Sequence, residues 1–444
     1  MSPPDPHHPR ITHRSVLALA VPVMLSNVST PLIGIVDTAV VGQIPDPAHI
    51  GAVAVAALVF TFVFWAFGFL RMGTTGLTAQ ALGARDGDEL LACLGRALLI
   101  AGGVGVALIA LQWPIREAAF ALLDGGTQVE ALARSYFDIR IWAAPATLAN
   151  YALLGWFIGR GRAGTALVLQ LTLNLCNVAL DVLFVLGLGM GVAGVALGTL
   201  LAECIAAGVG LTLAWVHVRG VDGRWSRARL LDAARLGRTL AVNRDIMIRS
   251  MALICVLLWF VANGAKQGEV VLAANAVLMH FVATASYFLD GLAFAAEALV
   301  GRAVGAAKRA MFDAAVFVTS LWAVLLAGAL SLAFLLAGPQ VIDLLTVDAA
   351  TREAAREHLA WAALAPLVGV WAFQLDGVFI GATQTAEMRR SMLLSLAIFL
   401  AAWWALRGWG NHGLWAAYHV SYVARAVTLG WYFPRLARSL GNAP

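Results

Sequence analysis

Short motifs in the first half of the chain recur in the second half at one fixed interval, and this repeat restricts the folds that the chain can adopt. The matching motifs are Gly83-Ala84-Arg85 and Gly305-Ala306-Ala307-Lys308, Phe157-Ile158-Gly159 and Phe379-Ile380-Gly381, and the apolar runs that begin at Gly191 and Gly413. Each pair is separated by 222 residues (305 − 83, for example), which is half of the 444-residue chain. Internal duplication of a strongly apolar chain is typical of membrane transporters built from two similar lobes.

The composition indicates a membrane protein. Hydrophobic residues make up 61% of the chain, charged residues make up 12%, and the mean hydropathy is +0.82. Soluble domains contain roughly 25% charged residues, so this chain lacks the polar residues needed to cover a water-facing surface. The net charge of +5 does not indicate a nucleic-acid partner, because the basic residues lie in short segments between apolar runs, where membrane topology explains them.

Apolar runs long enough to cross a bilayer continue from one end of the chain to the other. A spanning helix needs about 20 predominantly apolar residues, and on this criterion we predict twelve helices. They lie at 15–41, 51–80, 90–112, 132–158, 164–187, 192–217, 240–263, 270–301, 312–337, 355–380, 388–407 and 413–434. The expected fold is an all-α integral membrane protein with two pseudo-symmetric lobes of six helices each.

Basic residues gather in alternate loops between the predicted helices. These loops carry Arg85, Arg160, Arg162, Arg302, Lys308, Arg309, Arg389 and Arg390. The positive-inside rule places such loops, and with them both termini, in the cytoplasm. We therefore predict a multi-pass protein of the inner (plasma) membrane. Its predicted parts are a tail at 1–14, an N-lobe at 15–218, a basic cytoplasmic linker at 219–238, a C-lobe at 239–436 and a tail at 437–444.

Motifs for catalysis, metal binding or nucleotide hydrolysis are absent from the sequence. It contains no GxSxG, HExxH, GxxxxGK[ST] or CxxC pattern. The cysteines, which are Cys93, Cys176, Cys204 and Cys255, all lie inside apolar runs, so we expect buried thiols and no disulfides. We expect no enzyme activity, no metal site and no cofactor, and the energy for transport must come from an ion gradient or from the substrate's own gradient.

Asp37 lies in a mainly apolar stretch of the first predicted helix, after Pro22 and Pro31. A charged carboxylate at the bilayer centre costs roughly 2.5–3.5 kcal/mol on insertion scales, and intramembrane acids are therefore functional candidates by default. Proline removes a helix hydrogen bond and bends the helix, so protonation of Asp37 could be coupled to bending of this helix. The competing interpretation is that Asp37 caps a polar cluster near the outer membrane face.

Further polar residues lie on other predicted helices. Asp181 follows Asn177 by one turn, so both face the same side of their helix; they indicate either a hydrated cavity or a hydrogen-bonded seam between helices. In the second half, the candidates for a cavity wall or a structural ion pair are Asn275, Tyr287, Asp290 and Glu297. For Glu203 and Asp376 we favour a structural role, with Arg71, Arg244 and Arg249 as possible partners of the C-lobe acids.

The sequence resembles the multidrug and toxic compound extrusion (MATE) transporters, and within them the DNA-damage-inducible protein F (DinF) branch. The resemblance covers nearly the whole chain, from about Ser15 to Arg435. Its strongest stretches are Val36-Asp37-Thr38-Ala39-Val40-Val41-Gly42, Leu153-Leu154-Gly155-Trp156-Phe157-Ile158-Gly159, Asn243-Arg244-Asp245-Ile246-Met247-Ile248-Arg249-Ser250, Ala273-Ala274-Asn275-Ala276-Val277-Leu278 and Tyr287-Phe288-Leu289-Asp290-Gly291.

This resemblance implies two six-helix lobes around a cleft that opens alternately to each side, and antiport of an organic compound against a cation. It implies that Asp37 is the central protonation site, with Asp181 as a second ion-coupling residue and Pro22 as the bending proline. The N-lobe network around them is expected to contain Tyr136, Asn150, Asn177 and Thr199. The C-lobe candidates, Asn275, Tyr287, Asp290 and Glu297, match the family less closely.

The expected function is export of organic, often cationic or amphipathic, compounds in exchange for protons. Two alternatives stay open: a sodium-coupled MATE exporter, and a lipid-linked precursor flippase of the same superfamily, for which the two extra helices and the more cationic cavity are not evident in the sequence. The expected partners are small organic molecules and the lipid bilayer. The two lobes share one chain, so a monomer suffices.

Overall fold

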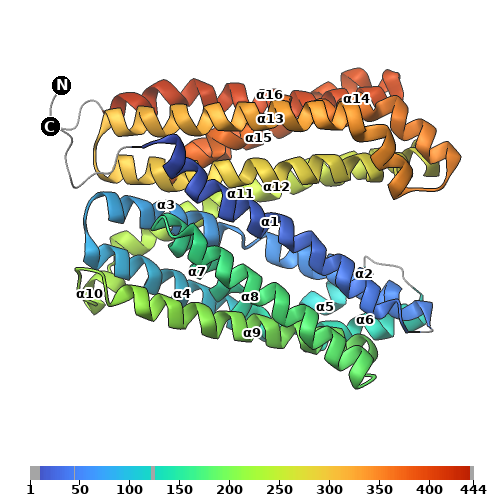
Figure 1. Cartoon of the computed structure of the whole chain (residues 1–444), viewed down its shortest axis with the longest axis horizontal. Coiled ribbons are helices and arrows are strands. Elements are labelled where there is room, and N and C mark those ends of the chain that lie inside the picture. Colours follow the sequence, from blue (N-terminus) through green and yellow to red (C-terminus); the bar gives the residue numbers. More distant parts are fainter. Residues whose placement is uncertain (1–10, 45, 122–125, 441–444) are drawn as a thin grey trace. The chain divides into compact units, whose positions relative to one another are not determined.

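The computed structural model describes residues 11–44, 46–121 and 126–440, and within these ranges all the regular elements are helices (Figure 1). Contacts divide the chain into two compact units. We call them the N-terminal unit, which comprises Leu25–Leu82 and Asp86–Leu240, and the C-terminal unit, which comprises Met1–Met24, Gly83–Arg85 and Ala241–Pro444.

The N-terminal unit is formed by antiparallel helices joined by short turns. In chain order its elements are most of α1 (His13–Val41), α2 (Pro47–Trp65), α3 (Phe69–Gly83), α4 (Gly87–Ala110), α5 (Gln112–Ala121), α6 (Thr127–Arg140), the 3₁₀ turn η1 (Ile141–Ala143), α7 (Ala144–Gly159), α8 (Ala163–Asp181), the π-helix η2 (Val182–Gly187), α9 (Gly191–Val218) and the single turn α10 (Arg227–Leu230). Helix α8 packs on α9, α4 on α7, and α2 on α6.

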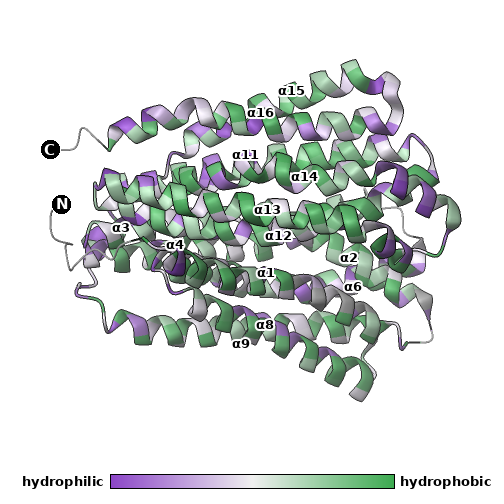
Figure 2. Cartoon of the chain, turned by 45° about the horizontal axis from the view of Figure 1, so that its top comes forward, coloured by the Kyte–Doolittle hydropathy of each residue, from purple (hydrophilic) through white to green (hydrophobic). Residues whose placement is uncertain are grey.

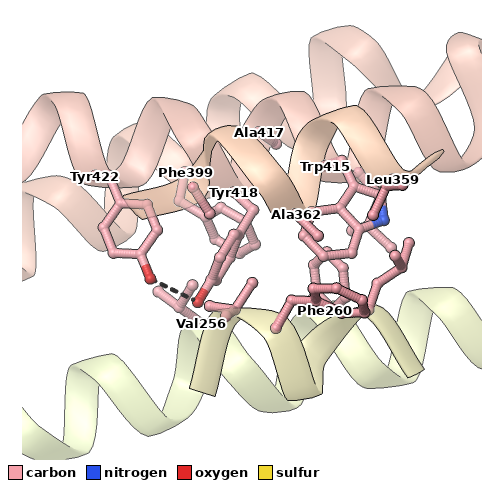
Figure 3. Packing of buried hydrophobic residues seen from close by; sticks show 14 of the residues in the cluster. Val256, Phe260, Leu359, Ala362, Phe399, Trp415, Ala417, Tyr418 and Tyr422 are labelled. Atoms are coloured by element: carbon pink, nitrogen blue, oxygen red, sulfur yellow. Dashed lines mark hydrogen bonds between the residues drawn. The ribbon is translucent and has the colours of Figure 1, made fainter. Parts of the chain in front are cut away.

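The C-terminal unit contains longer helices. They are α11 (Ala233–Ala265), α12 (Glu269–Gly305), α13 (Arg309–Leu345), α14 (Ala349–Gly381), α15 (Thr385–Leu406) and α16 (Gly410–Ser439), with the 3₁₀ turn η3 (Arg407–Trp409) before α16. Helix α12 packs on α14 along much of its length, and α15 packs on α16. This unit encloses an aromatic core in which Phe260 of α11 lies 4.9 Å from Trp415 and 5.3 Å from Tyr418, both of α16, between ring centroids (Figure 3).

The predicted number of membrane crossings agrees with the helices. Ten segments of the described residues are long and apolar enough to span a bilayer, and the last of them, Thr385–Ser439, contains both α15 and α16. With the 29-residue helix α1, these segments account for twelve crossings. Figure 2 shows the corresponding pattern, with hydrophobic residues along the helices and hydrophilic residues concentrated toward their ends.

Three local expectations were wrong. The predicted helix at 51–80 is broken into α2 and α3 by a turn at 66–68, and the one at 132–158 consists of α6, η1 and α7. The cysteines are unpaired, as expected, but Cys204 and Cys255 are exposed on the protein surface and only Cys93 is fully buried. The reason is that residues of a spanning helix can face lipid, so an apolar run does not imply burial inside the protein.

The 222-residue repeat is reproduced in the turns that end corresponding helices. The amide of Asp86 donates to the carbonyl of Ala81 at 3.0 Å, and the amide of Lys308 donates to that of Ala303 at 3.1 Å. In both turns the residue before the donor is left-handed, with φ of 57° at Arg85 and 51° at Ala307. These are helix C-caps of one type, so the two corresponding helices end in the same backbone conformation.

Close helix packing is repeated at the same interval. A Cβ atom on Gly159 of α7 would lie 2.5 Å from the carbonyl oxygen of Thr75, and one on Gly381 of α14 would lie 2.5 Å from that of Glu297. Thr75 and Glu297 are themselves 222 residues apart. Small residues at helix contacts allow backbones to approach closely in membrane proteins, so these glycines set the spacing of the central helices in each unit.

We therefore expect Gly159→Ala and Gly381→Ala each to destabilise the protein by about 1–3 kcal/mol, because the backbone atoms that the new methyl group meets cannot move without separating two helices. The measurement is the thermal unfolding midpoint in detergent. Gly164→Ala is the control, since nothing lies within 4 Å of a Cβ at that helical position. Equal midpoints for all three variants would contradict the packing argument.

The predicted linker region packs on the start of α4. Arg229 binds both carboxylate oxygens of Asp86, the N-cap of α4, at 2.7 and 2.6 Å. Arg235 and Arg96 both pair with Glu89. Partial burial of Asp86 opposes its ionisation, but the hydrogen bonds from Arg229 outweigh that effect and hold the pKa of Asp86 below its usual value. The basic segment is thus fixed to the N-terminal unit by specific ion pairs.

Candidate functional site

Two carboxyl groups from different helices meet inside the N-terminal unit. Asp37 lies on α1 and is half-buried, and Asp181 is the last residue of α8 and is fully buried. Their side chains are in direct hydrogen-bonding contact. Two carboxylates in contact repel each other when both are ionised, so the pair favours a state that holds a proton.

The local backbone positions Asp181 toward this contact. The six residues that follow it, Val182–Gly187, form a π-helix, an irregularity that is frequent at functional sites because it re-aims neighbouring side chains. On the facing helix α9, a Cβ at Gly198 would collide with Oδ1 of Asp181. The absence of a side chain at Gly198 therefore leaves room for the carboxyl group.

A polar network surrounds the pair. The side-chain amide of Asn177 donates to Oδ2 of Asp181 at 3.1 Å and lies 3.2 Å from the hydroxyl of Thr199. That hydroxyl donates to the carbonyl of Val195 at 2.9 Å and also interacts with the hydroxyl of Tyr136, which is buried. Oδ1 of Asp37 and Oδ1 of Asp181 are both buried without a hydrogen-bond partner among the described residues. The site therefore has acceptor capacity that a proton or a cation can use.

Arg140 supplies the positive charge next to the carboxyl pair. It acts electrostatically on both Asp37 and Asp181, and its guanidinium lies 5.5 Å from the ring centroids of Phe60 and Phe64. The same guanidinium pairs with Glu203 at 3.5 Å. Its positive charge therefore offsets part of the negative charge of the neighbouring carboxyl groups.

Glu203 is held in turn by Asn150. The amide nitrogen of Asn150 donates to Oε2 of Glu203 at 2.7 Å and to its backbone carbonyl at 3.1 Å. The predicted network residue Asn150 therefore reaches Asp37 and Asp181 only indirectly, through Glu203 and Arg140. The structural role expected for Glu203 agrees with these buried contacts.

The charge of this cluster depends on how many protons it holds. With all side chains ionised, the three acids Asp37, Asp181 and Glu203 together with Arg140 carry a net charge of −2. One proton reduces this to −1, and a second removes it. An uncompensated charge in a low-dielectric setting is costly, so the number of bound protons determines how strongly the cluster attracts a cation.

The predicted bending residue Pro22 lies apart from this cluster along the chain. It belongs to the segment of α1 that is part of the C-terminal unit, whereas Asp37 belongs to the N-terminal unit. Helix α1 is helical throughout His13–Val41 and includes both Pro22 and Pro31 (Figure 1). Bending at Pro22 therefore stays a prediction.

The C-lobe candidates all lie on α12 and differ in their contacts. Asn275 exchanges hydrogen bonds with Asn411 at 2.8 and 2.9 Å and accepts one from the indole of Trp415 at 2.9 Å, so it fastens α12 to α16. Tyr287 interacts electrostatically with Asp290. Glu297 is buried two turns further along α12, where its backbone carbonyl meets Gly381 of α14.

A buried ion-pair triad occupies the C-terminal unit instead. Asp376 of α14 pairs with Arg249 of α11 and with Arg425 of α16, and all three side chains are at most 9% exposed. Asp290 acts electrostatically on Arg249, and the guanidinium of Arg425 lies 5.8 Å from the ring centroid of Phe373. The carboxylate of Asp376 therefore lies between two positive charges.

The two units differ at positions that the 222-residue repeat relates. Adding 222 to Asp37 and Asp181 gives Trp259 and Trp403, whose rings are in edge-to-face contact with centroids 5.1 Å apart. The same side-chain contact is therefore acidic in one unit and aromatic in the other. Among the described residues, a carboxyl pair of this kind is confined to the N-terminal unit.

Sequence reasoning missed Arg140 and Gly198. Arg140 lies within the predicted helix at 132–158, and an arginine inside an apolar span was a signal that could have identified it. Gly198 carried no signal, because its importance depends on the proximity of Asp181 on another helix. Asn174, three residues before Asn177 on α8, also contacts α1, because its amide donates to the hydroxyl of Ser29 at 2.7 Å.

Comparisons with known proteins agree with this architecture. The MatE family model matches residues 22–183 and 246–404. The chain is 40% identical to the DNA damage-inducible protein F of Escherichia coli, over 93% of this chain and 90% of that protein. It is 26% identical to a probable multidrug resistance protein NorM of Rhizobium meliloti, over 98% of this chain and 96% of that one.

Solved structures share the fold. An outward-facing multidrug resistance MATE family transporter of the MOP superfamily superposes with a TM-score of 0.87, at 18% sequence identity and with 97% of each chain covered. A MATE structure in a straight conformation gives a TM-score of 0.88, at 18% identity and with the same coverage. At this level of identity the likeness concerns the fold, which has twelve transmembrane helices in these transporters.

Proposed function

Since this chain belongs to the MatE family of multidrug efflux transporters, we propose that it is an antiporter that exports organic cations and amphipathic compounds in exchange for protons. The observation that carries this proposal is the contact between the carboxyl groups of Asp37 and Asp181 inside apolar helices. Two acids that share a buried site bind a proton in preference to ionising together.

In the proposed cycle, the deprotonated pair attracts a cationic substrate from the cytoplasmic side. Protonation from the outside then removes the negative charge, weakens the attraction and releases the substrate outward. When Asp37 and Asp181 are both protonated, the cluster is neutral overall, because the charge of Arg140 balances that of Glu203. Substrate and proton thus compete for the same negative charge, which is the thermodynamic requirement for antiport.

Contacts in both units favour protons over sodium as the coupling ion. At Asp181, Oδ2 already accepts a hydrogen bond from the amide N–H of Asn177, and the positive charge of Arg140, which acts on both acids, opposes a metal cation. In the C-terminal unit, Asp376 is already paired with two arginines, and their positive charges oppose a metal cation there.

The proposed location is the inner (plasma) membrane, with both termini in the cytoplasm, as the distribution of arginines in the loops supports. The proposed working form is a monomer that uses small organic substrates, the bilayer and protons, without a cofactor. The basic segment at 219–238 would then lie on the cytoplasmic side, where its ion pairs with Asp86 and Glu89 hold it against α4.

The proposal is tested by proton movement in proteoliposomes that contain the purified protein and a pH-sensitive dye, in buffers free of sodium. Addition of an ethidium-like cation should trigger proton movement that protein-free liposomes do not show. The rate should be unchanged, within twofold, when sodium chloride replaces potassium chloride. Transport that begins only when sodium is supplied would refute proton coupling, and no transport of cations under either condition would favour the flippase alternative.

A further inference from the structure

Two histidines and a glutamate from two helices converge in the C-terminal unit. Glu357 and His358 lie in the first three turns of α14, and His412 lies at the start of α16. One ligand atom from each residue lies within 4.8 Å of those of the other two. The imidazole rings of His358 and His412 are stacked, with centroids 4.2 Å apart.

Hydrogen bonds prepare His358 to act as a metal ligand. Its Nδ1 lies 2.9 Å from the carbonyl oxygen of Ala354, one turn earlier on α14. A carbonyl only accepts, so Nδ1 carries the proton and Nε2 keeps its lone pair. Metal-bound histidines show this arrangement, in which the second ring nitrogen donates to a backbone carbonyl and fixes the tautomer. His358 is buried, so its ring is also held in place by packing.

His412 connects the cluster to a tryptophan. The indole N–H of Trp361 donates to Nδ1 of His412 at 3.0 Å, and Nε2 of His412 lies 3.4 Å from the carboxylate of Glu357. A neutral imidazole has only one lone pair, and Trp361 uses it here. A metal ion that binds either nitrogen of His412 must therefore displace the indole. The fluorescence of Trp361 should consequently change when the metal binds.

The arginines near Glu357 on α14 pair with a different acid, so they do not compete with a metal ion for its carboxylate. The two arginines on the same face of α14, Arg352 and Arg356, both pair with Asp343, at 3.6 and 2.5 Å. Glu357 and His412 have 60% and 43% of their side chains exposed, so both can rotate to shorten the distances between donor atoms. Tetrahedral zinc requires bonds of about 2.0–2.2 Å to such donors, which this freedom allows.

We propose that Glu357, His358 and His412 form a binding site for a divalent transition-metal ion of the Zn²⁺ class, which clamps the beginning of α14 to the beginning of α16. Two imidazoles and one carboxylate are a donor set that zinc accepts, and water completes the fourth position. The motif search could not reveal this site, because His412 lies on a different helix from the other two ligands.

The test is a titration of the purified full-length protein with Zn²⁺ by isothermal calorimetry. The protein carries His7→Ala and His8→Ala, because these two terminal histidines can bind zinc themselves, and its affinity tag is removed. We expect one Zn²⁺ per chain and a thermal unfolding midpoint that rises on saturation. Affinity should fall at pH 5.5, since protons compete for the ligands. Zn²⁺ should also change the tryptophan fluorescence, and most of this change should be lost in Trp361→Phe.

Matched variants decide the assignment. His412→Ala and Glu357→Gln should each weaken Zn²⁺ binding at least tenfold, whereas His280→Ala, which removes an exposed histidine of α12, should bind as before. Glu357→Gln alters one atom of an exposed side chain, so it reports on the site even if His412→Ala fails to fold. Absence of Zn²⁺ binding, or binding that the two cluster variants leave unchanged, would overturn the proposal.

Discussion

Asp37→Asn is expected to reduce substrate-driven proton movement to the level of liposomes without protein, while the folded protein remains in the membrane. Asparagine has nearly the shape of protonated aspartic acid but cannot release a proton. The contact with Asp181 is therefore preserved in form, but the pair keeps only one carboxyl group and can no longer pass between a doubly ionised and a doubly protonated state. The measurement is substrate-triggered proton flux in sodium-free proteoliposomes, together with monodispersity of the purified variant.

The control for this prediction is Asp138→Asn. Asp138 is also an aspartate of the N-terminal unit, but it is 48% exposed and pairs with Arg116 at the surface. Its replacement removes a carboxylate without touching the buried pair, so proton flux should stay within twofold of wild type. If Asp37→Asn still exports an organic cation in exchange for protons, the assignment of the coupling site to Asp37 is wrong.

Asp181→Asn extends this argument to the second acid. Residues that act as one unit lose function almost as completely when one is replaced as when all are, so Asp181→Asn alone should reduce substrate-driven proton flux as far as Asp37→Asn does. An Asp181→Asn variant whose flux stays within twofold of wild type would show that the two carboxyl groups do not exchange protons as a pair.

Spacing along one helix made part of this site predictable. Asn177 and Asp181 are four residues apart, and the prediction that they share a face is confirmed by the 3.1 Å hydrogen bond between them. The contact of Asp37 with Asp181 joins α1 to α8 and could not be obtained from spacing within either helix. It was accessible only through resemblance to a family, which identified both residues without giving their geometry.

Features that depend on backbone irregularity were not predictable. The break between α2 and α3 lies in a continuous apolar run, and hydropathy alone does not distinguish a turn buried in protein from a helix that crosses lipid. The π-helix after Asp181 likewise has an apolar sequence, Val182–Gly187. In contrast, the repeated left-handed turns at Arg85 and Ala307 lie at the motifs that defined the 222-residue repeat, so the repeat was informative about backbone geometry.

Asp376→Asn is expected to destabilise the C-terminal unit by about 3–5 kcal/mol, because it removes the carboxylate that pairs with both Arg249 and Arg425 and leaves two buried guanidiniums facing each other. Asp290 also acts electrostatically on Arg249, and it stays in place in this variant. The measurement is the thermal unfolding midpoint in detergent, alongside the yield of monodisperse protein.

The matched control is Asp313→Asn, which removes an aspartate that pairs with Arg309 at 2.8 Å on the surface of α13, where its side chain is 52% exposed. Surface ion pairs contribute little, so its midpoint should hardly change. A third variant separates loss of charge balance from loss of packing: when Arg249→Met and Arg425→Met accompany Asp376→Asn, no charge is left uncompensated, and much of the stability should return. If the triple variant is no more stable than Asp376→Asn alone, the triad stabilises this unit through its hydrogen-bond geometry and not through the balance of its charges.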